Sequence, residues 1–390
     1  MANSTGKIKS IEIRFLEAKL NKPFGWSQRW TTSRSIIILK LTTSENYVGW
    51  GETYGSYNSC IEMKSLAELV IGQDSDNINK INNKIFSQTF QSHAFAGSAS
   101  SFMSALDIAL YDIRGKFLNE PISTLLGGCL KRNIPVYATG LYYLEGFPIK
   151  PHLDEALGYI KEGFTGMKMK VGGLSISDDA KRVSQTREAI GPNIKLMIDA
   201  NEAYDKRTAL ELSELISQDN ITWFEEPCPS RDFHSNRYVT ENSKIPISGG
   251  ESLHTSLEFS RVISDNVFDI IQPDICSVGG VSEMRKVGNM ANSFGVKINP
   301  HFWGTGISFS AVLHCMSVQR ILNNSQVNAP YENQSVLEFD QTPHPIRDEL
   351  TDKFIIKNST VEVPQKPGLG IEINEDVLDK YLKGEIINVY

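Results

Sequence analysis

The sequence predicts an α/β protein built around a (β/α)8-like barrel, with an α+β domain in front of the barrel. From Ile134 onward, apolar runs of strand length alternate with segments of helical periodicity. Three of these runs end in a carboxylate, at Asp199, Glu225 and Glu251, and both separations are 26 residues. One strand, one helix and two loops take about 25 residues. The equal spacing therefore predicts three consecutive barrel strands.

An α+β domain is expected over residues 1–130. Residues 8–52 contain apolar runs separated by a polar turn, which is a hairpin signal, and residues 61–118 have helical apolar stripes. The polar segment 21–34, between the first two apolar runs, is expected to be a loop. Residues 346–390 return to short strands, and we expect this tail to pack back on the first domain and complete it.

The barrel is expected over residues 131–345. Two of its connecting helices are expected at 177–189 and 281–293. The eight predicted strands are 134–139, 165–171, 194–200, 221–226, 245–250, 268–274, 295–300 and 335–339. Parallel barrel strands bring their C-terminal ends to one mouth, where binding and catalytic residues gather.

Composition and charge exclude several classes of function. The formal net charge is −7, so no basic field along the sequence indicates nucleic-acid binding. No run approaches the ~18 apolar residues of a membrane span, and the first 15 residues lack a signal-peptide core. The five cysteines are widely spaced, which fits reduced thiols in a cytoplasmic protein.

The three carboxylates are predicted to bind a metal ion. Asp199, Glu225 and Glu251 would repel one another at a single mouth, and a divalent cation removes that repulsion. Oxygen-only ligands favour magnesium or manganese. Glu225 and Glu226 are adjacent on a predicted strand, so only one of them is expected to face inward, and the spacing selects Glu225. Taken singly, each of these acids is about as often a surface acid or a helix cap.

Two candidate bases lie on well separated strands. Lys168 and Lys170 share one face of the predicted strand 165–171, and two adjacent, partly buried ammonium groups lower each other's pKa. A neutral lysine can then act as a general base. Asp274 and His301 end neighbouring predicted strands, and such a carboxylate raises the histidine pKa and fixes its tautomer. Alone, a Lys-x-Lys pair is more often solvated and a histidine more often structural. Because Asp199, Glu225 and Glu251 are expected at the same barrel mouth, a catalytic role is favoured here instead.

The remaining candidates are expected around the same mouth. Glu338, at the end of the eighth predicted strand, could donate a hydrogen bond or a proton to a substrate oxygen. The side chains expected to contact a polyhydroxylated, anionic substrate are Asn201, Trp303, Trp26 and Arg29.

The residue order just described is accompanied by five short motifs: Gly49–Glu52, Ala105–Lys116, Trp223–Pro227, Gln272–Asp274 and Pro367–Gly370. In this combination, which extends over essentially the whole chain, the sequence resembles the mandelate racemase subgroup of the enolase superfamily. Within the subgroup it is similar to galactarolactone cycloisomerases and to 3,6-anhydrogalactonate cycloisomerases. The first of these similarities is carried by Pro300–Gly306, Glu338–Asp340 and Gly368–Asn374.

The resemblance implies a role for each candidate. The implied metal ligands are Asp199, Glu225 and Glu251, binding Mg²⁺ or Mn²⁺. The implied acid–base groups are Lys170, the Asp274–His301 pair and the electrophilic acid Glu338, with Lys168 contacting the substrate carboxylate. The resemblance also implies that segment 21–34 closes the mouth, and that the chain forms homo-oligomers, either octamers or dimers.

The predicted metal site and bases indicate one first step, removal of a proton, followed by one of three reactions. A cation that binds a sugar-acid carboxylate makes its α-proton removable, because the ion stabilises the resulting enediolate. Loss of a ring-bound β-oxygen then gives cycloisomerisation, which is the expected reaction, while loss of a free hydroxyl gives dehydration. Return of the proton to the other face gives racemisation or epimerisation. The rival outside catalysis is a silent sugar-acid-binding relative, which would be expected to lack a ligand or a base.

Overall fold

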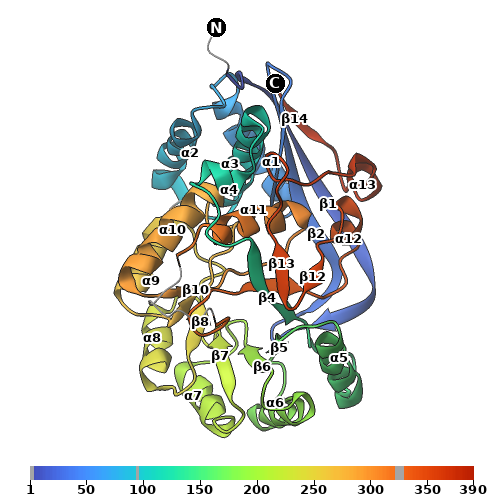
Figure 1. Cartoon of the computed structure of the whole chain (residues 1–390), viewed down its shortest axis with the longest axis vertical. Coiled ribbons are helices and arrows are strands. Elements are labelled where there is room, and N and C mark those ends of the chain that lie inside the picture. Colours follow the sequence, from blue (N-terminus) through green and yellow to red (C-terminus); the bar gives the residue numbers. More distant parts are fainter. Residues whose placement is uncertain (1–3, 94–95, 321–328) are drawn as a thin grey trace.

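The computed structural model describes residues 4–93, 96–320 and 329–390. The predicted segment 1–130 also includes residues 1–3 and 94–95, and the predicted segment 131–345 includes residues 321–328, all of which lie outside the described ranges. Within the described ranges, eight parallel strands form the barrel: β4 (Asn133–Thr139), β5 (Gly166–Lys170), β6 (Lys195–Asp199), β7 (Ile221–Glu225), β8 (Ile247–Gly249), β9 (Ile270–Ile271), β10 (Lys297–Ile298) and β11 (Leu337–Asp340). Their order is β10-β9-β8-β7-β6-β5-β4, with β11 pairing with β4. Figure 1 labels β4 to β8 and β10 of this set. Each strand overlaps a predicted range, so the predicted barrel is confirmed.

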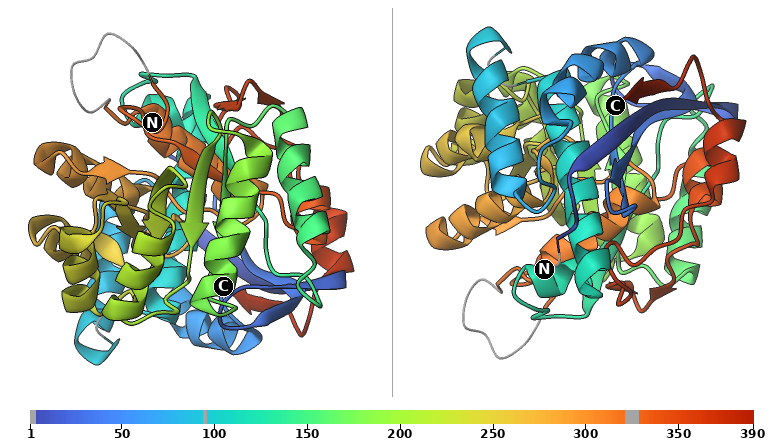
Figure 2. Two further views of the ribbon diagram at one scale, coloured as in Figure 1. Left: turned by 90° about the horizontal axis from the view of Figure 1, so that it is seen from below. Right: turned by 90° about the horizontal axis from the view of Figure 1, so that it is seen from above.

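Helices cover the outside of the barrel (Figure 2). They are α5 (Ile149–Lys161), α6 (Ile176–Ile190), α7 (Lys206–Leu215), α8 (Phe233–Asn242), α9 (Thr255–Ser264), α10 (Gly280–Phe294) and α11 (Gly306–Ser317). Polar side chains cap several helix starts; Ser175 accepts a hydrogen bond from Asp178 N–H, and Asp205 accepts two from the first turn of α7. In the described ranges no helix is long and apolar enough to cross a membrane.

The N-terminal capping domain packs helices against an antiparallel sheet. The sheet has the order β14-β1-β2-β3 and consists of β1 (Ile8–Gly25), β2 (Trp30–Thr43), β3 (Val48–Thr53) and β14 (Ile387–Val389). The helices are α1 (Tyr57–Val70), α2 (Ile78–His93), α3 (Ser98–Leu118) and the short α4 (Ile122–Leu125). Figure 1 shows the long β1–β2 hairpin leaving this domain and running down beside the barrel.

The expected loop 21–34 is wrong for most of its length. β1 and β2 continue to pair through Phe24–Thr31 and Gly25–Trp30, which leaves only residues 26–29 as a turn. The pairing with the partner strand outweighs the polar composition of the segment, because each added residue pair satisfies backbone donors and acceptors. At its tip the hairpin reaches the barrel, where Gly25 and Tyr143 exchange two backbone hydrogen bonds of 2.8 Å.

Strand pairing divides the C-terminal tail between the two sheets. β12 (Ile356–Lys357) and β13 (Thr360–Glu362) form a hairpin that pairs with barrel strand β4 rather than with the capping sheet, whereas β14 pairs with β1. In the chain, α12 (Pro345–Leu350) precedes β12, and α13 (Glu375–Lys380) lies between β13 and β14. The division into segments 1–130, 131–345 and 346–390 stays a prediction.

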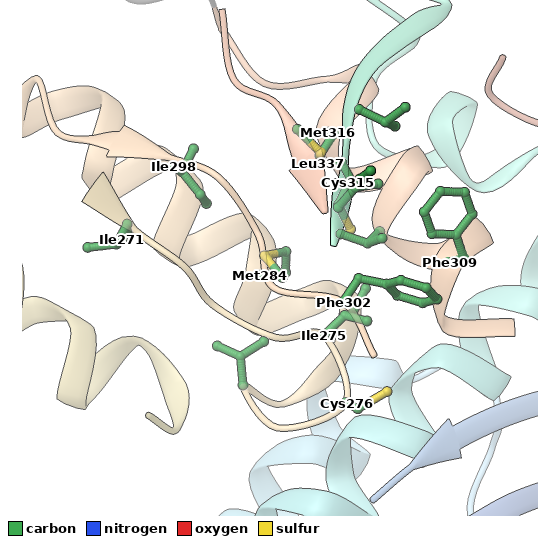
Figure 3. Packing of buried hydrophobic residues seen from close by; sticks show 14 of the residues in the cluster. Ile271, Ile275, Cys276, Met284, Ile298, Phe302, Phe309, Cys315, Met316 and Leu337 are labelled. Carbon is green, nitrogen blue, oxygen red and sulfur yellow. The ribbon is translucent and has the colours of Figure 1, made fainter. Parts of the chain in front are cut away.

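Apolar packing supports the arc of the barrel formed by β9, β10 and β11. One buried cluster includes Ile271, Ile298 and Leu337 from these strands, Met284 of α10, and Phe309, Cys315 and Met316 of α11. Figure 3 shows these members of the cluster. Burying one such side chain stabilises the fold by roughly 1.5–3 kcal/mol. Among the described residues no ladder joins β10 to β11, but Val336 N–H donates to Asn299 Oδ1 at 3.1 Å across that gap.

Buried carboxylates attach the capping domain to the barrel helices. Glu52 accepts hydrogen bonds from Thr305 N–H (2.7 Å) and from the Ser308 hydroxyl at the start of α11. Asp107 accepts from Ser282 N–H (2.9 Å) and the Ser282 hydroxyl (2.7 Å) at the start of α10. Helix N-termini carry unsatisfied N–H groups and a partial positive charge, so they are suitable partners for these acids. Burial raises the pKa of Asp107 to about 6.

Candidate active site

A cavity of about 570 Å³ opens between the barrel mouth and the capping domain. The capping domain contributes Trp26, Gln28, Arg29, Ser35, Tyr54 and Gly55 to its wall. The barrel contributes Tyr142, Lys170, Asn201, Glu202, Glu226, Glu251, Ser252, Asp274, Ser277, His301 and Trp303. The four predicted substrate contacts, Asn201, Trp303, Trp26 and Arg29, therefore all line one cavity. Lys168 and Glu338 are buried next to this set.

The three predicted metal ligands end neighbouring strands, as their spacing predicted. In the parallel ladders, Lys170 pairs with Asp199 and Asp199 pairs with Glu225. Glu251 follows β8 after Gly250, whose φ of +114° is a conformation that favours glycine. Asp199 and Glu225 are buried, and their charges act on each other and on Glu251.

Two lysine side chains lie among these carboxylates. Lys168 Nζ contacts Glu225 Oε1, lies 2.9 Å from Glu338 Oε1 and lies 3.5 Å from Asp199 Oδ2. Lys170 Nζ contacts Asp199 Oδ2. Burial alone would lower both lysine pKa values, but the neighbouring carboxylates outweigh it and raise the pKa of each lysine. The predicted lowering is therefore wrong for this arrangement, because it considered only the second ammonium group and burial.

The donor set fits a hard divalent cation. Every candidate ligand is an oxygen, and Glu251 Oε2, Glu226 Oε1 and Asn201 Oδ1 are buried without a hydrogen-bond partner. Burial, opposed by Lys168 and reinforced by Asp199, raises the pKa of Glu225 to about 7. Across the described residues no three His, Cys, Asp or Glu side chains are already arranged as ligands of one ion. The lysine ammonium groups pair with Asp199 and Glu225 instead.

Asp274 and His301 form the predicted pair. His301 Nδ1 lies 2.6 Å from Asp274 Oδ2, so it donates to the carboxylate and leaves Nε2 directed toward Glu251 Oε2 at 3.4 Å. Tyr54 OH (2.9 Å) and Cys276 N–H (2.6 Å) hold the same carboxylate. Burial lowers the His301 pKa, but Glu251 and other acids outweigh it and raise the pKa to about 10.

Lys170 and His301 reach the cavity from well separated strands. On one side of the ring β4 and β11 lie between them, and on the other side β6 to β9 do. Glu338, at the mouth end of β11, accepts from Phe302 N–H at 3.2 Å. Burial raises its pKa, but Lys168 and His301 outweigh burial and lower it, so Glu338 is a carboxylate in this arrangement. Its role as a proton donor stays a prediction.

Glu226 lies in the cavity, which corrects the expectation that only one of the two adjacent glutamates faces inward. Strand β7 ends at Glu225, and Glu226 has a φ of +39°, so the alternation of a strand no longer applies to it. Burial and the charge of Glu251 raise its pKa well above the usual value. The proline at position 227 in the sequence was the available sign that the strand stops here.

Tyr54 and Arg34 are further functional candidates that the sequence did not assign. Arg34 stacks on the Trp303 ring with its Cζ 3.8 Å from the ring centroid, and it donates to Trp303 O at 2.9 Å. Trp26 packs edge-to-face on Trp303, with centroids 5.7 Å apart, and Arg29 lies 4.9 Å over Trp26. The capping domain thus orients the aromatic wall of the cavity. The folded β1–β2 hairpin brings Trp26 and Arg34 to Trp303, and Tyr54, which follows β3, accepts from Trp303 N–H at 3.3 Å.

Comparisons with known proteins agree with this architecture. The Mandelate racemase / muconate lactonizing enzyme N-terminal domain family matches residues 10–127, and the Enolase C-terminal domain-like family matches residues 152–377. D-galactarolactone cycloisomerase of Agrobacterium fabrum is 33% identical over 378 residues, covering 96% of this chain and 98% of the relative.

Two solved structures are also similar. That of the 3,6-anhydro-D-galactonate cycloisomerase from Zobellia galactanivorans has a TM-score of 0.86 and 35% identity, covering 97% of this chain and 100% of the other. That of L-talarate/galactarate dehydratase from Salmonella typhimurium LT2, liganded with Mg and L-lyxarohydroxamate, has a TM-score of 0.85 and 25% identity, covering 98% and 94%. With both family domains matched in order along its length, this chain belongs to the enolase superfamily and is an enzyme of that superfamily.

Proposed function

We propose that this enzyme removes the α-proton of a sugar-acid carboxylate bound to Mg²⁺ and then expels a β-oxygen, which cycloisomerises a sugar-acid lactone or an anhydro sugar acid. The observation that carries the proposal is the convergence on one cavity of Lys170, the Asp274–His301 pair and the strand ends bearing Asp199, Glu225 and Glu251. The names of the similar proteins include cycloisomerases and a dehydratase, which supports sugar acids as the substrate class.

The metal-binding role is assigned to the three strand-end acids. Asp199, Glu225 and Glu251 would hold Mg²⁺, with Mn²⁺ as the alternative, since all three provide oxygen. When bound, the ion would polarise the substrate carboxylate and stabilise negative charge on it. Lys168, buried between Glu225 and Glu338, would position that carboxylate with its ammonium group.

The proton transfers are assigned to the two separated bases. Lys170 Nζ and His301 Nε2 would approach the α-carbon from different sides; one removes the proton, and the other returns one or assists the leaving oxygen. Asp274 keeps His301 in the tautomer that presents Nε2 to the cavity. Glu338 would act as the acid toward a substrate oxygen. Asn201, Trp26, Trp303 and Arg29 would contact the polyhydroxylated remainder.

The alternative reactions differ in what leaves. Expulsion of a free β-hydroxyl would make the enzyme a dehydratase, and reprotonation from the second face would make it a racemase or epimerase of a hydroxy acid. A catalytically silent binder should have lost a ligand or a base, whereas this chain retains each of them. Homo-oligomers, octamers or dimers, and a cytoplasmic location remain predictions from the sequence.

The test is a substrate panel of aldonates, aldarates and their lactones and anhydro forms, incubated with Mg²⁺ in D₂O and followed by proton NMR. We expect α-proton exchange together with opening of a lactone or anhydro ring. A keto-deoxy product from an open-chain acid would indicate dehydration instead, and exchange with inversion alone would indicate epimerisation. Absence of exchange and turnover on every acid would refute the proposal.

A further inference from the structure

Glu226 is a buried acid in the wall of the cavity. Its side chain is 2% exposed and lines the cavity, and its Oε1 has no hydrogen-bond partner. Among the described residues, no cation forms an ion pair with it. Burying a carboxylate in this way is costly unless a positive charge accompanies it.

Glu226 contrasts with its neighbour Glu225. Glu225 Oε1 contacts Lys168, while Glu225 Oε2 accepts from Gln272 Nε2 (2.6 Å) and Trp223 Nε1 (3.3 Å). The strongest charges acting on Glu226 are, by contrast, those of other acids: Glu251, Asp199, Glu202 and Glu225. Three donors therefore contact Glu225, whereas among the described residues Glu226 Oε1 has no hydrogen-bond partner.

The backbone holds Glu226 in this position. Its N–H donates to Ser248 O at 2.9 Å, and its carbonyl accepts from Glu202 N–H at 2.8 Å, so it is tied to the ends of both flanking strands. Its φ of +39° is uncommon for a residue with a side chain, and Asn201 and Glu202 beside it also have positive φ. An unpartnered acid is thus directed into the cavity by surroundings that fix its backbone.

We propose that Glu226 is a further carboxylate of the divalent-cation site, which increases affinity for the ion by adding a negative charge beside Asp199, Glu225 and Glu251. The inference rests on the proposed function, since it presupposes that these three residues bind the ion. Lys168 and Lys170 are the two ammonium groups beside these four acids, and Lys168 is shared with Glu338, so negative charge is in excess and a dication would reduce it.

The test is calorimetric titration of the metal-free enzyme with MgCl₂ and with MnCl₂. Glu226→Gln removes the charge and keeps the shape of the side chain, and we expect about a tenfold or greater rise in Kd. The matched control is Glu202→Gln, which alters a less buried acid of the same cavity wall, and its Kd should change much less. An unchanged or tighter Kd in Glu226→Gln would overturn the inference, whereas no ion binding by the wild type would refute the proposed metal site itself.

Thermal unfolding in EDTA distinguishes ion binding from a structural role. Glu226→Gln removes an unpartnered buried charge, so the metal-free variant should unfold at the same or a higher temperature than the wild type. Glu226→Asp keeps the charge and should recover most of the affinity. If the Gln variant loses stability without metal, or if the Asp variant binds no better than it, then Glu226 serves the fold and the inference fails.

Discussion

The buried carboxylates of the domain interface and those of the barrel mouth have different partners. At the domain interface, Glu52 and Asp107 accept hydrogen bonds from backbone N–H groups and hydroxyls at the starts of two barrel helices. At the barrel mouth, Asp199 and Glu225 face lysine ammonium groups, and Glu226 faces other acids. An acid served by fixed neutral donors belongs to the scaffold. An acid paired with a movable ammonium group can exchange that partner for a ligand.

The largest expected effect concerns the acids at the barrel mouth, which we propose bind a cation that the interface acids do not need. We expect EDTA to abolish turnover and added Mg²⁺ to restore it, while the near-UV circular dichroism spectrum stays unchanged because lysine pairs replace the ion. Turnover that persists in EDTA, after metal analysis confirms that the ion is removed, would contradict the assignment.

The next largest effect is expected at Lys170. Lys170→Ala should lower kcat by about 10²- to 10⁴-fold, because a positioned general acid or base contributes that much. The control is Lys150→Ala, which removes an exposed lysine paired with Asp154 and should leave kcat unchanged. A tenfold or smaller loss in a correctly folded Lys170→Ala enzyme would remove Lys170 from the chemistry.

Asp274 is expected to affect kcat by fixing the tautomer of His301. Asp274→Asn keeps the shape but replaces a carboxylate that accepts from His301 Nδ1, so the tautomer that presents Nε2 is no longer enforced. We expect a fall in kcat of about a hundredfold with KM little changed. An equal fall in Asp219→Asn, a half-buried acid just before the N-terminal end of β7 and so at the strand end away from the mouth, would show that the loss is not specific to this pair.

At the interface the expected effect concerns stability and pH. The folded pKa of Asp107, about 6, lies above the ordinary value of about 3.9, so the folded state binds this proton more tightly than the unfolded state does. The contribution of Asp107 to stability is therefore greatest below about pH 4 and is lost as pH rises through about 6, a change of about 3 kcal/mol.

Urea unfolding of the wild type and Asp107→Asn at several pH values measures this contribution. The difference in unfolding free energy, wild type minus variant, should fall between about pH 4 and 6 and then level off. A difference that rises with pH would mean that the helix N-terminus holds Asp107 as a carboxylate throughout, and the two regions would then be more alike than proposed.

The smallest effect is expected at Tyr54, where the capping domain meets the mouth. Tyr54→Phe removes one of the donors to Asp274 but leaves His301 and Cys276 N–H in place. One hydrogen bond is worth about 1 kcal/mol, so kcat should fall only about fivefold. A loss above a hundredfold would show that Tyr54 touches the substrate, beyond its positioning role.

Most of the barrel strands could be predicted from the local pattern of apolar and polar residues. Strand and helix lengths set the 26-residue spacing of Asp199, Glu225 and Glu251, and each of the eight strands overlaps a predicted range. The errors arose where pairing across the fold decides the outcome. The segment 21–34 became paired strands because a partner strand lies beside it, and the lysine pKa values rose because β7 and β11 bring Glu225 and Glu338 to Lys168.

The chain alone determined which side chains stand at successive strand ends, because periodicity and loop length are properties of neighbouring residues. The surroundings of those side chains were decided only by the tertiary structure: the partner of each ammonium group, the turn that directs Glu226 into the cavity, and the hairpin that orients Trp303. Charge and solvation depend on atoms from strands far apart in sequence, and no local pattern specifies their distances.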